Sequence, residues 1–375
     1  MLSKEAIIEA ARNNGFRDVG FTTAEPFESH KAFLAKRQDK YGWIEKSGYS
    51  LLAGTDPQSI LPGAKTIIVM LEEYFQKSFP LALESHFGRC YLDDDRVTRV
   101  GLYKRVKAFR GLLRDNGIDS KVPPHLPHRM SAARAGLGTF GKNGLFFSRR
   151  LSGKSSFVLP IAVVIDHKFE ADEPTLEMGC PDWCRNVCIA ACPTRALLGN
   201  AALDPRKCIS YLSYYGNGLT PKELREPMGL YVYGCDRCQN VCPRNAACLA
   251  AEKPINENAQ AKLKDFSLSK LLAMDTDYYK EKIWPHMFYM PAKDIWRWKM
   301  NVARVMGNSG DRAYTRDLIT AFETEADWRV KAMAAWALGR LGSAAAIEAL
   351  NNFAEKSDGI VAEEVADALT TAAKV

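Results

Sequence analysis

Residues 180–193 read CPDWCRNVCIAACP, and residues 235–243 read CDRCQNVCP. Each stretch ends in Cys-Pro, and one further cysteine precedes the second stretch by 27 residues. Bacterial ferredoxins hold two 4Fe–4S clusters in blocks that end in Cys-Pro, and each closing cysteine binds the other block's cluster. We therefore expect two 4Fe–4S clusters and one-electron chemistry. The expected ligands are Cys180, Cys184, Cys188 and Cys242 for one cluster, and Cys192, Cys208, Cys235 and Cys238 for the other.

The cysteine spacing departs from the usual ferredoxin pattern. All three gaps of the first block hold three residues, whereas bacterial ferredoxins have gaps of two, two and three. Structural zinc also uses thiolates at short spacing, so zinc remains an alternative, although Cys-Pro endings have no role in a zinc site. Disulfides are disfavoured because the chain opens without an export signal, which indicates a reducing compartment.

The composition describes a globular chain of two or three domains. It has 375 residues, 47% of them hydrophobic, and a formal net charge of +7. No apolar run approaches the length of a membrane span, so we expect a cytoplasmic protein without a membrane partner. The basic balance is compatible with a nucleic-acid partner.

The first 170 residues predict a mixed α/β domain. The stretch 66–70, Thr-Ile-Ile-Val-Met, and the stretch 157–165 are rich in β-branched residues and predict buried strands. Pro160 lies within the second of these and predicts an edge position or a bulge. A short strand is expected at 18–21. Apolar residues recur at helical spacing between 97 and 116, and a helix capped by Ser3 is expected at the start.

The C-terminal part repeats itself at a period near 31 residues. The stretch 303–307, Ala-Arg-Val-Met-Gly, resembles 335–339, Ala-Trp-Ala-Leu-Gly, and 366–369 echoes both. Phe322 and Phe353 are 31 residues apart. Such a period with Ala and Leu stripes is typical of paired helices stacked as HEAT-like repeats.

The fold class expected from these features is α+β in three parts. Residues 1–170 form the mixed α/β domain, residues 171–250 the ferredoxin-like two-cluster domain, and residues 251–375 a linker followed by HEAT-like repeats.

A glycine-rich segment, RAGLGTFGKNGL, occupies residues 134–145. Its glycines fit G-x-G-x-x-G, which on its own suggests dinucleotide binding. The context argues against a Rossmann unit, because residues 130–134 look helical instead of forming a strand, and no clear acidic residue ends a second strand about 20 residues later.

The sequence resembles the epoxyqueuosine reductases, which are cobalamin- and iron–sulfur-dependent enzymes related to reductive dehalogenases. The matching stretches follow the order of the family's motifs. They are 61–65, the glycine segment, Cys192-Pro193-Thr194, 207–212, 234–243 and Gly307-Asn308-Ser309.

The resemblance implies a corrinoid held by the α/β domain with no histidine ligand on cobalt, and clusters that feed electrons to it. It implies reduction of epoxyqueuosine to queuosine in tRNA, an external low-potential electron donor and a monomer. Glycines let backbone amides approach a large macrocycle closely. The residues implied to bind the cofactor are Arg134, Gly136, Gly138, Gly141, Lys142, Asn143 and Ser156.

The family carries an acidic proton donor upstream of the glycine segment, and this chain departs from that pattern. Counted back without gaps from Arg134, the position of the acid falls on Val122. His128, His125 and Asp119 are the candidate replacements, since an imidazole can donate a proton near neutral pH. Solvent-facing loop histidines are the alternative reading.

Three functions remain open at this point. The chain is a reductase acting on tRNA, a divergent paralogue acting on a small molecule, or an iron–sulfur electron donor that activates a corrinoid partner. Basic residues on one face would favour tRNA, and Trp298 could stack on a base or lie buried in the repeats. The candidate phosphate contacts are Lys104, Arg105, Lys107, Arg110, Arg114, Arg149, Arg150, Lys154, Arg297, Lys299 and Arg304.

Overall fold

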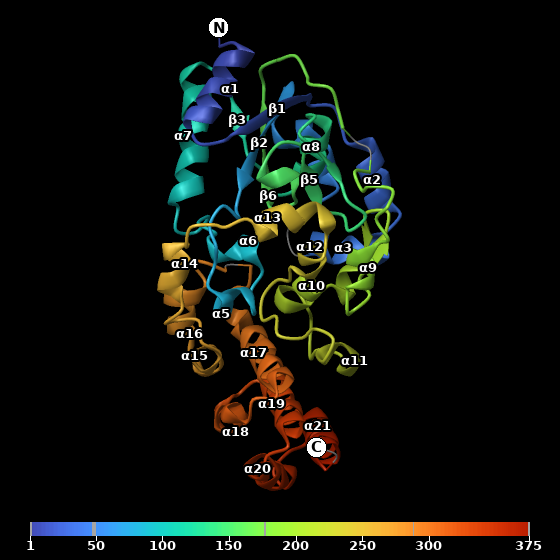
Figure 1. Cartoon of the computed structure of the whole chain (residues 1–375), viewed down its shortest axis with the longest axis vertical. Helices are drawn as coiled ribbons and strands as arrows, with labels where there is room; N and C mark the ends of the chain where they lie inside the picture. The colour runs from blue at the N-terminus through green and yellow to red at the C-terminus, as the bar shows by residue number, and fades with distance from the viewer. Residues whose placement is uncertain (1, 47–49, 176–177, 288, 374–375) are drawn as a thin grey trace. The chain divides into compact units, whose positions relative to one another are not determined.

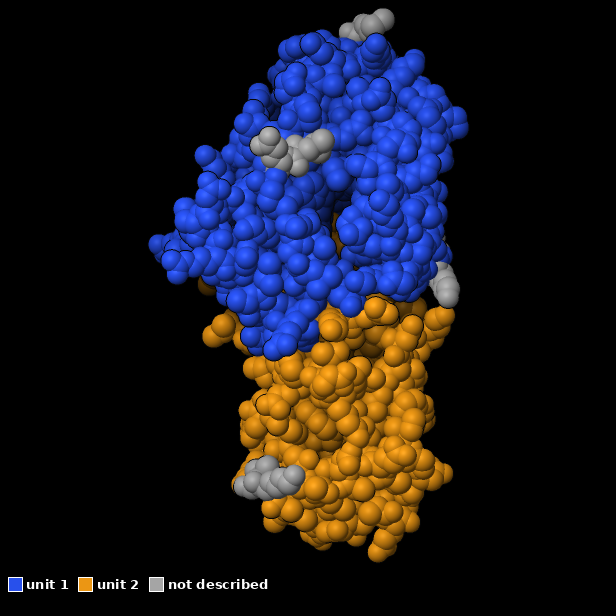
Figure 2. Space-filling model, turned by 90° about the vertical axis from the view of Figure 1, so that its right-hand side faces the viewer, with its two compact units in different colours: residues 1–77, 99–205, 237–254 blue, residues 78–98, 206–236, 255–375 orange. Residues whose placement is uncertain are grey.

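The computed structural model describes residues 2–46, 50–175, 178–287 and 289–373. The chain divides into two compact units, coloured separately in Figure 2. Unit 1 comprises residues 1–77, 99–205 and 237–254, and unit 2 comprises residues 78–98, 206–236 and 255–375. Each unit is assembled from three separate segments of the chain. The three-part division expected from the sequence stays a prediction.

Unit 1 is built on a four-stranded antiparallel sheet with the order β1-β2-β6-β3. Its strands are β1 (Asp18–Thr23), β2 (Thr66–Glu73), β3 (Ser120–Lys121) and β6 (Val158–Ile165). Two small hairpins pair β4 (Gly138–Phe140) with β5 (Phe146–Ser148), and β7 (Leu197–Gly199) with β8 (Ala202–Leu203). The helices of the unit are α1 (Lys4–Asn13), α2 (Glu28–Ala35), α3 (Gln38–Lys46), α4 (Pro57–Ile60), α7 (Gly101–Asp115), α8 (His128–Arg134), α9 (Val187–Ala190), α12 (Arg237–Asn240) and α13 (Ala246–Ala250).

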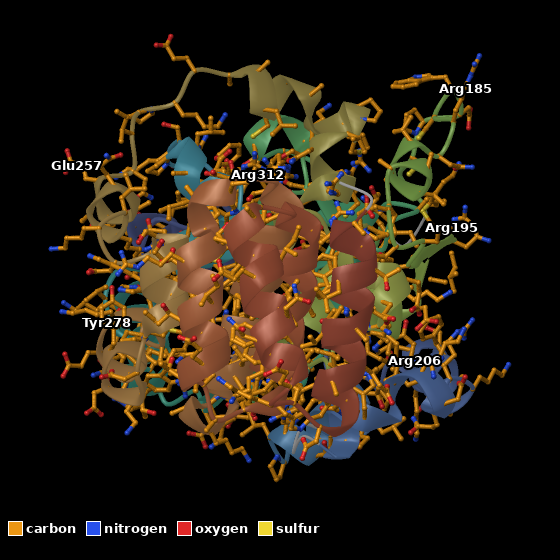
Figure 3. The ribbon with its side chains drawn as sticks, turned by 90° about the horizontal axis from the view of Figure 1, so that it is seen from below. Arg185, Arg195, Arg206, Glu257, Tyr278 and Arg312 are labelled. Carbon is orange, nitrogen blue, oxygen red and sulfur yellow. The ribbon has the colours of Figure 1, made fainter. Side chains whose placement is uncertain are left out.

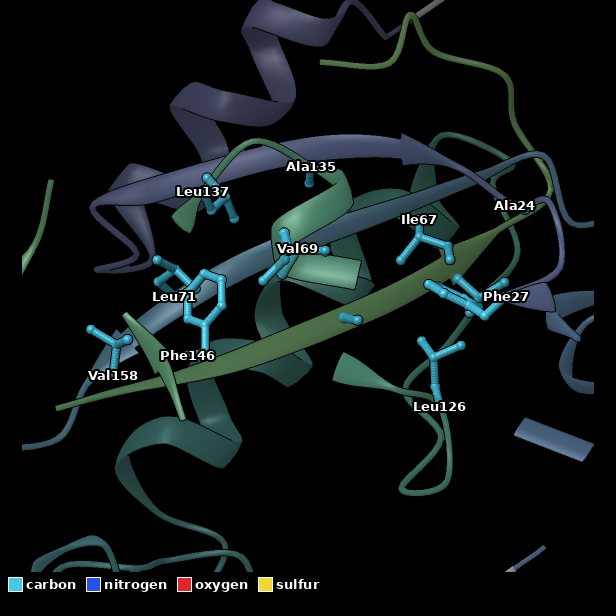
Figure 4. Close-up of a cluster of buried hydrophobic side chains, with 14 of the residues drawn as sticks. Ala24, Phe27, Ile67, Val69, Leu71, Leu126, Ala135, Leu137, Phe146 and Val158 are labelled. Carbon is cyan, nitrogen blue, oxygen red and sulfur yellow. The ribbon is translucent and has the colours of Figure 1, made fainter. Parts of the chain in front are cut away.

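Both faces of the sheet are buried, as the continuous apolar runs predict. Ile67, Val69 and Leu71 of β2 face a cluster that includes α8 (Figure 4), whereas Ile68 and Met70 face α1 and α7 on the other side (Figure 1). The layers are therefore helix, sheet and helix. The expected Ser3 cap is present, because its hydroxyl accepts a hydrogen bond from the Ala6 amide.

Pro160 has no amide proton, and it lies where β6 has no partner strand on one of its two sides. β6 is not an edge strand, but β3 pairs only with Val164 and Ile165. Pro160 lies beyond the reach of β3, so its strand has a free edge at that point and no ladder hydrogen bond is lost.

Unit 2 ends in stacked helices, which Figure 3 shows from below. Its earlier helices are α5 (Leu81–Glu84), α6 (Arg89–Leu92), α10 (Ile209–Tyr214), α11 (Lys222–Arg225), α14 (Glu257–Lys262), α15 (Leu268–Ala273) and α16 (Thr276–Tyr278), followed by a π-helical turn at Tyr279–Ile283. The stack contains α17 (Ile295–Ser309), α18 (Thr315–Thr324), α19 (Trp328–Leu341), α20 (Ala344–Ala354) and α21 (Gly359–Ala372).

The repeat predicted from the sequence is confirmed by the way these helices pack. α19 packs against both α17 and α21. Gly307 of α17 and Gly339 of α19 sit at successive crossings, and a Cβ there would lie 2.8 Å and 2.7 Å from backbone atoms of the next helix. Phe322 and Phe353 stack with their ring centroids 3.8 Å apart. The 31-residue period is thus a packing requirement for small residues at each crossing.

Candidate metal centre and active site

Four cysteines expected to bind one cluster lie close together in unit 1. Burial raises the pKa of the Cys188 thiol, and nearby Cys242, Cys180 and Cys184 raise this pKa further. Burial also raises the pKa of Cys242, to which Cys180 contributes. The short helices α9 and α12, which carry parts of the two cysteine blocks, pack against each other. The structure therefore brings both blocks to one site, as the ferredoxin arrangement requires.

Backbone amides point at the sulfurs of this group. The Lys142 amide donates a hydrogen bond to Cys180 Sγ at 3.3 Å. The backbones of Arg244 and Asn245 lower the pKa of the Cys242 thiol in opposition to burial, and the Asn245 N–H donates to the Cys242 carbonyl oxygen at 2.9 Å. Such bonds favour the thiolate and raise the reduction potential of a bound cluster. The donor set fits a 4Fe–4S cluster.

The second expected ligand set is drawn from both units. Cys192 and Cys238 belong to unit 1, and Cys208 and Cys235 belong to unit 2. Within unit 1, Cys192 Sγ accepts a hydrogen bond from the Ala196 amide at 3.3 Å. The assignment of these four residues to one cluster stays a prediction.

All ten cysteines lie in the described part of the chain and are free thiols, so the structure contains no disulfide. Among the described residues, no three His, Cys, Asp or Glu side chains are grouped so as to hold a metal ion. A four-iron cube spaces its thiolates more widely than a single ion does, because each thiolate binds a different iron.

The glycine segment forms the turn from α8 into the β4–β5 hairpin. A Cβ at Gly138 would lie 2.1 Å from the Phe147 carbonyl oxygen, and one at Gly136, whose φ is +71°, would lie 2.5 Å from the Glu173 carbonyl oxygen. Close packing within the protein therefore explains these glycines. Asn143 has an unsatisfied hydrogen-bond donor, because its buried Nδ2 has no hydrogen-bond partner among the described residues.

Ser156 joins the α/β sheet to the second cysteine block. Its amide donates to Asn245 Oδ1 at 2.9 Å, and its hydroxyl accepts from Asn245 Nδ2 at 2.9 Å and from Gln239 Nε2 at 3.0 Å. Gln239 also donates to the Tyr74 hydroxyl at 3.0 Å. These side chains form a buried polar network that orders the segment around Cys242.

Arg134 is bonded to the end of β1. Its guanidinium donates to the Glu25 carbonyl oxygen at 2.9 Å and to Thr23 Oγ1 at 2.8 Å, and it lies over the Phe27 ring. Burial lowers the pKa of Arg134. These contacts give Arg134 a structural role, and its part in cofactor binding stays a prediction.

The His128 ring is held by backbone groups at both nitrogens. Nδ1 accepts a hydrogen bond from the Ala162 amide at 2.9 Å, and Nε2 lies 2.8 Å from the Pro123 carbonyl oxygen. This pairing fixes a neutral ring with its proton on Nε2. His128 thereby satisfies the free edge of β6, and it would have to break the bond to Pro123 before donating a proton.

The other two candidates differ in their surroundings. His125 is half-buried and packs against Gly54, where a Cβ would lie 2.0 Å from the His125 carbonyl oxygen. Asp119 is exposed, and its amide donates to Asp166 Oδ1 at 3.0 Å beside the end of β6. Val122, at the position expected for the family's acid, packs against the core formed with α1 and α7.

The comparisons with known proteins cover nearly the whole chain. Residues 180–245 match the 4Fe-4S double cluster binding domain, and residues 296–370 match HEAT repeats. The epoxyqueuosine reductase of Bacillus cereus is 30% identical over 94% of this chain and 93% of its own length, and that of Staphylococcus aureus is 30% identical over 98% and 96%. The chain belongs to the epoxyqueuosine reductase family.

Solved structures of epoxyqueuosine reductases are similar throughout. One from Bacillus subtilis, in which the catalytic aspartate loop is swung out of the active site, has a TM-score of 0.81 at 27% identity and covers 98% of both chains. Another, with an epoxyqueuosine-modified tRNA stem loop, has a TM-score of 0.81 at 26% identity and covers 99% of this chain and 98% of its own.

Four of the residues considered for contact with tRNA are buried within unit 2 instead. Trp298 stacks on Tyr233 with centroids 5.1 Å apart, which resolves its two readings in favour of the core. Arg297 donates to the Gly216 carbonyl oxygen, Lys299 pairs with Glu325, and Arg304 donates to the carbonyl oxygens of Gly229 and Tyr231. These contacts correct the expectation that the three cations face phosphates.

A polar network beside Cys235 was not predicted from the sequence. Asp236 accepts from the Arg89 amide at 2.8 Å and from its guanidinium at 3.3 Å, and Arg89 pairs with Glu84 at 2.9 Å. Burial raises the pKa of Asp236. No spacing rule links residues 147 positions apart, so nothing in the sequence indicated that Arg89 holds the residue next to Cys235.

Proposed function

We propose that this protein reduces epoxyqueuosine to queuosine in tRNA as a cobalamin-dependent iron–sulfur reductase. The observation that carries the proposal is the close group of Cys180, Cys184, Cys188 and Cys242 in a chain that matches epoxyqueuosine reductases along nearly its entire length. Two 4Fe–4S clusters then deliver electrons one at a time.

The corrinoid is assigned to the α/β part of unit 1. Asn143 offers an unpaired amide donor, and Lys142 and Asn143 directly follow Gly141, next to the first cysteine group. These residues would hold polar groups of the macrocycle. When bound, cobalamin supplies a reducible cobalt centre for breaking a carbon–oxygen bond.

His125 is the proposed proton donor to the oxygen that leaves the epoxide, with Asp119 as the second candidate. The fixed neutral ring of His128 supports a positioning role for that residue, in which it holds the loop 123–128 against β6. An imidazole is a common general acid in proteins.

The expected partners are tRNA and an external low-potential electron donor, for a monomer acting in the cytoplasm. No helix among the described residues is long and apolar enough to cross a bilayer. The exposed cations of α7 and the β5–β6 connection supply the remaining phosphate contacts, among them Lys104, Lys107, Arg149 and Lys154.

A paralogous reductase for a small molecule is the second candidate. It is favoured by Val122, whose side chain packs in the core where family members carry an acid, and by the burial of Arg297, Lys299 and Arg304.

One experiment separates these functions. The protein is purified without oxygen, loaded with iron, sulfide and cobalamin, and incubated with dithionite and tRNA containing epoxyqueuosine, after which the nucleosides are separated by mass spectrometry. The proposal predicts queuosine. Unchanged epoxyqueuosine together with corrinoid absorption bands supports the small-molecule reductase, and loss of those bands on gel filtration supports the electron donor.

A further inference from the structure

Unit 1 contains a cavity of about 430 Å³ at the open edge of β1. The residues around it come from α1, the start of β1, the turn after α8, the segment after β5 and residues 172–173. A volume of this size accommodates a small organic ligand. Apart from Gly136, none of its lining residues belongs to the expected cluster, corrinoid or proton-donor residues, whereas Arg149 and Arg150 are among the candidate phosphate contacts with tRNA.

The outer wall of the cavity is held in place by the chain that runs beside β1. The Asp172 amide donates to the Phe21 carbonyl oxygen at 2.9 Å, and the Phe21 amide donates to Asp172 Oδ2 at 2.8 Å. Lys4 of α1 pairs with Asp172 Oδ1 at 2.6 Å. The cavity is therefore preformed, which lowers the ordering cost of binding a ligand.

Four arginines from separate segments line this cavity: Arg12, Arg17, Arg149 and Arg150. Arg17 pairs with Glu73 at 3.1 Å and Arg150 with Asp18 at 3.1 Å. Within the described ranges, Arg12 and Arg149 have no ion pair. Two unpaired guanidinium groups at one cavity favour an anion with several oxygens, above all a phosphate.

Asp18 indicates a second property of the ligand, which is a hydrogen-bond donor. It is 4% exposed, and its Oδ2 has no hydrogen-bond partner in the described structure, whereas Oδ1 is bonded to Arg150. Burial raises the pKa of this carboxyl group. Leaving a buried carboxylate oxygen without a hydrogen-bond donor costs free energy. A ligand that offers an N–H or O–H group to Asp18 Oδ2 would remove this cost.

We propose that this cavity binds a ribose phosphate, with the phosphate on Arg12 and Arg149 and a sugar hydroxyl donating to Asp18 Oδ2. Carboxylates that receive ribose hydroxyls and arginines that bind phosphate are both established modes of nucleotide recognition. The same chemistry is present in a free nucleotide, in a tRNA backbone and in the nucleotide tail of a corrinoid. Competition experiments distinguish these three sources.

The probe is adenosine monophosphate, titrated by calorimetry into the full-length protein at low salt. It is expected to bind, while adenosine, which lacks the phosphate, and 2′,3′-dideoxyadenosine monophosphate, which lacks both hydroxyls, bind at least about tenfold more weakly. Arg149→Gln is expected to weaken the nucleotide about tenfold and to reduce its salt dependence. Asp18→Asn is expected to abolish the preference for the nucleotide over its dideoxy form.

The matched control is Arg114→Gln, because Arg114 is an exposed arginine of the same unit that lies outside the cavity. It is expected to leave binding unchanged. If an RNA stem loop displaces the nucleotide, the site binds tRNA; displacement by cobalamin assigns the site to the corrinoid tail; if neither displaces it, the ligand is a free nucleotide.

No binding of the nucleotide at millimolar concentration overturns the proposal. So does equal binding by the parent protein, Arg149→Gln and Asp18→Asn, provided that all three melt as folded proteins. Reduction of epoxyqueuosine is assayed on the same samples. A protein that binds the nucleotide without reducing epoxyqueuosine refutes the proposed function alone.

Discussion

Asn245 allows a quantitative test of how the cluster segment is attached to the sheet. Its side chain is fully buried and exchanges hydrogen bonds of 2.9 Å with the Ser156 amide, the Ser156 hydroxyl and the Gln239 carbonyl oxygen. Asn245→Ala leaves the amide and the carbonyl without these partners. At about 1–3 kcal/mol for each of these two orphaned buried groups, the free energy of unfolding falls by about 2–6 kcal/mol.

The assay is thermal unfolding of the protein purified without oxygen, together with its iron content. A loss of this size lowers the melting temperature by about 10 °C, given about 2–4 °C per kcal/mol for a unit of roughly 200 residues. Iron content falls as well, because the segment that carries Cys242 loses the side-chain bonds that attach it to Ser156 and Gln239. Asn13→Ala, at the exposed end of α1, is the control and changes stability by less than about 0.5 kcal/mol. A melting temperature of Asn245→Ala equal to that of the control would refute the reasoning.

Three further predictions concern the cluster, the proton donor and pH. Cys188→Ser lowers iron from about eight to about four atoms per chain, measured colorimetrically, and iron that stays at eight would exclude Cys188 as a ligand. His125→Ala lowers turnover of epoxyqueuosine by about 100-fold at unchanged iron and cobalamin content. His128→Ala instead lowers the melting temperature, because the backbone groups of Ala162 and Pro123 lose their hydrogen-bond partner. The reverse pattern would exchange the roles of the two histidines. Burial, assisted by Lys262, lowers the pKa of His286 from 6.5 to about 4. The unfolded chain therefore binds more protons between these values, so stability falls as pH drops from about 6.5 to about 4 and this contribution is constant below; His286→Gln flattens that part of a melting-temperature profile.

The sequence predicted the helices and strands that depend on the residue pattern of a single segment. β-branched runs became β2 and β6, and the 31-residue repeat became a helix stack because small residues must recur wherever helices cross. The Cys-Pro endings predicted that cysteines of the two blocks share a cluster, and Cys242 of the second block lies near Cys180, Cys184 and Cys188 of the first.

Residues with distant partners could not be interpreted in the same way. Arg304 looks like a surface cation in the sequence, yet it lies buried against carbonyl oxygens more than 70 positions earlier. His128 lies in a loop-like stretch rich in proline, but its role depends on a free amide of Ala162 that exists only because β3 is two residues long. The sequence shows that a charged group or an imidazole is present, but the tertiary structure determines which partner that group contacts.

The first helix of the stack is bonded to the loop that carries Cys235. Asn301 donates to the carbonyl oxygens of Ser213 and Val232, and Asn308 donates to those of Arg225 and Gly229. A chain ending at residue 294 would leave these carbonyls unpaired and uncover Tyr233, the stacking partner of Trp298. The repeats are thus required by the rest of unit 2. A gene deletion that removed them would also disorder the loop that carries Cys235, so the two parts must be inherited together.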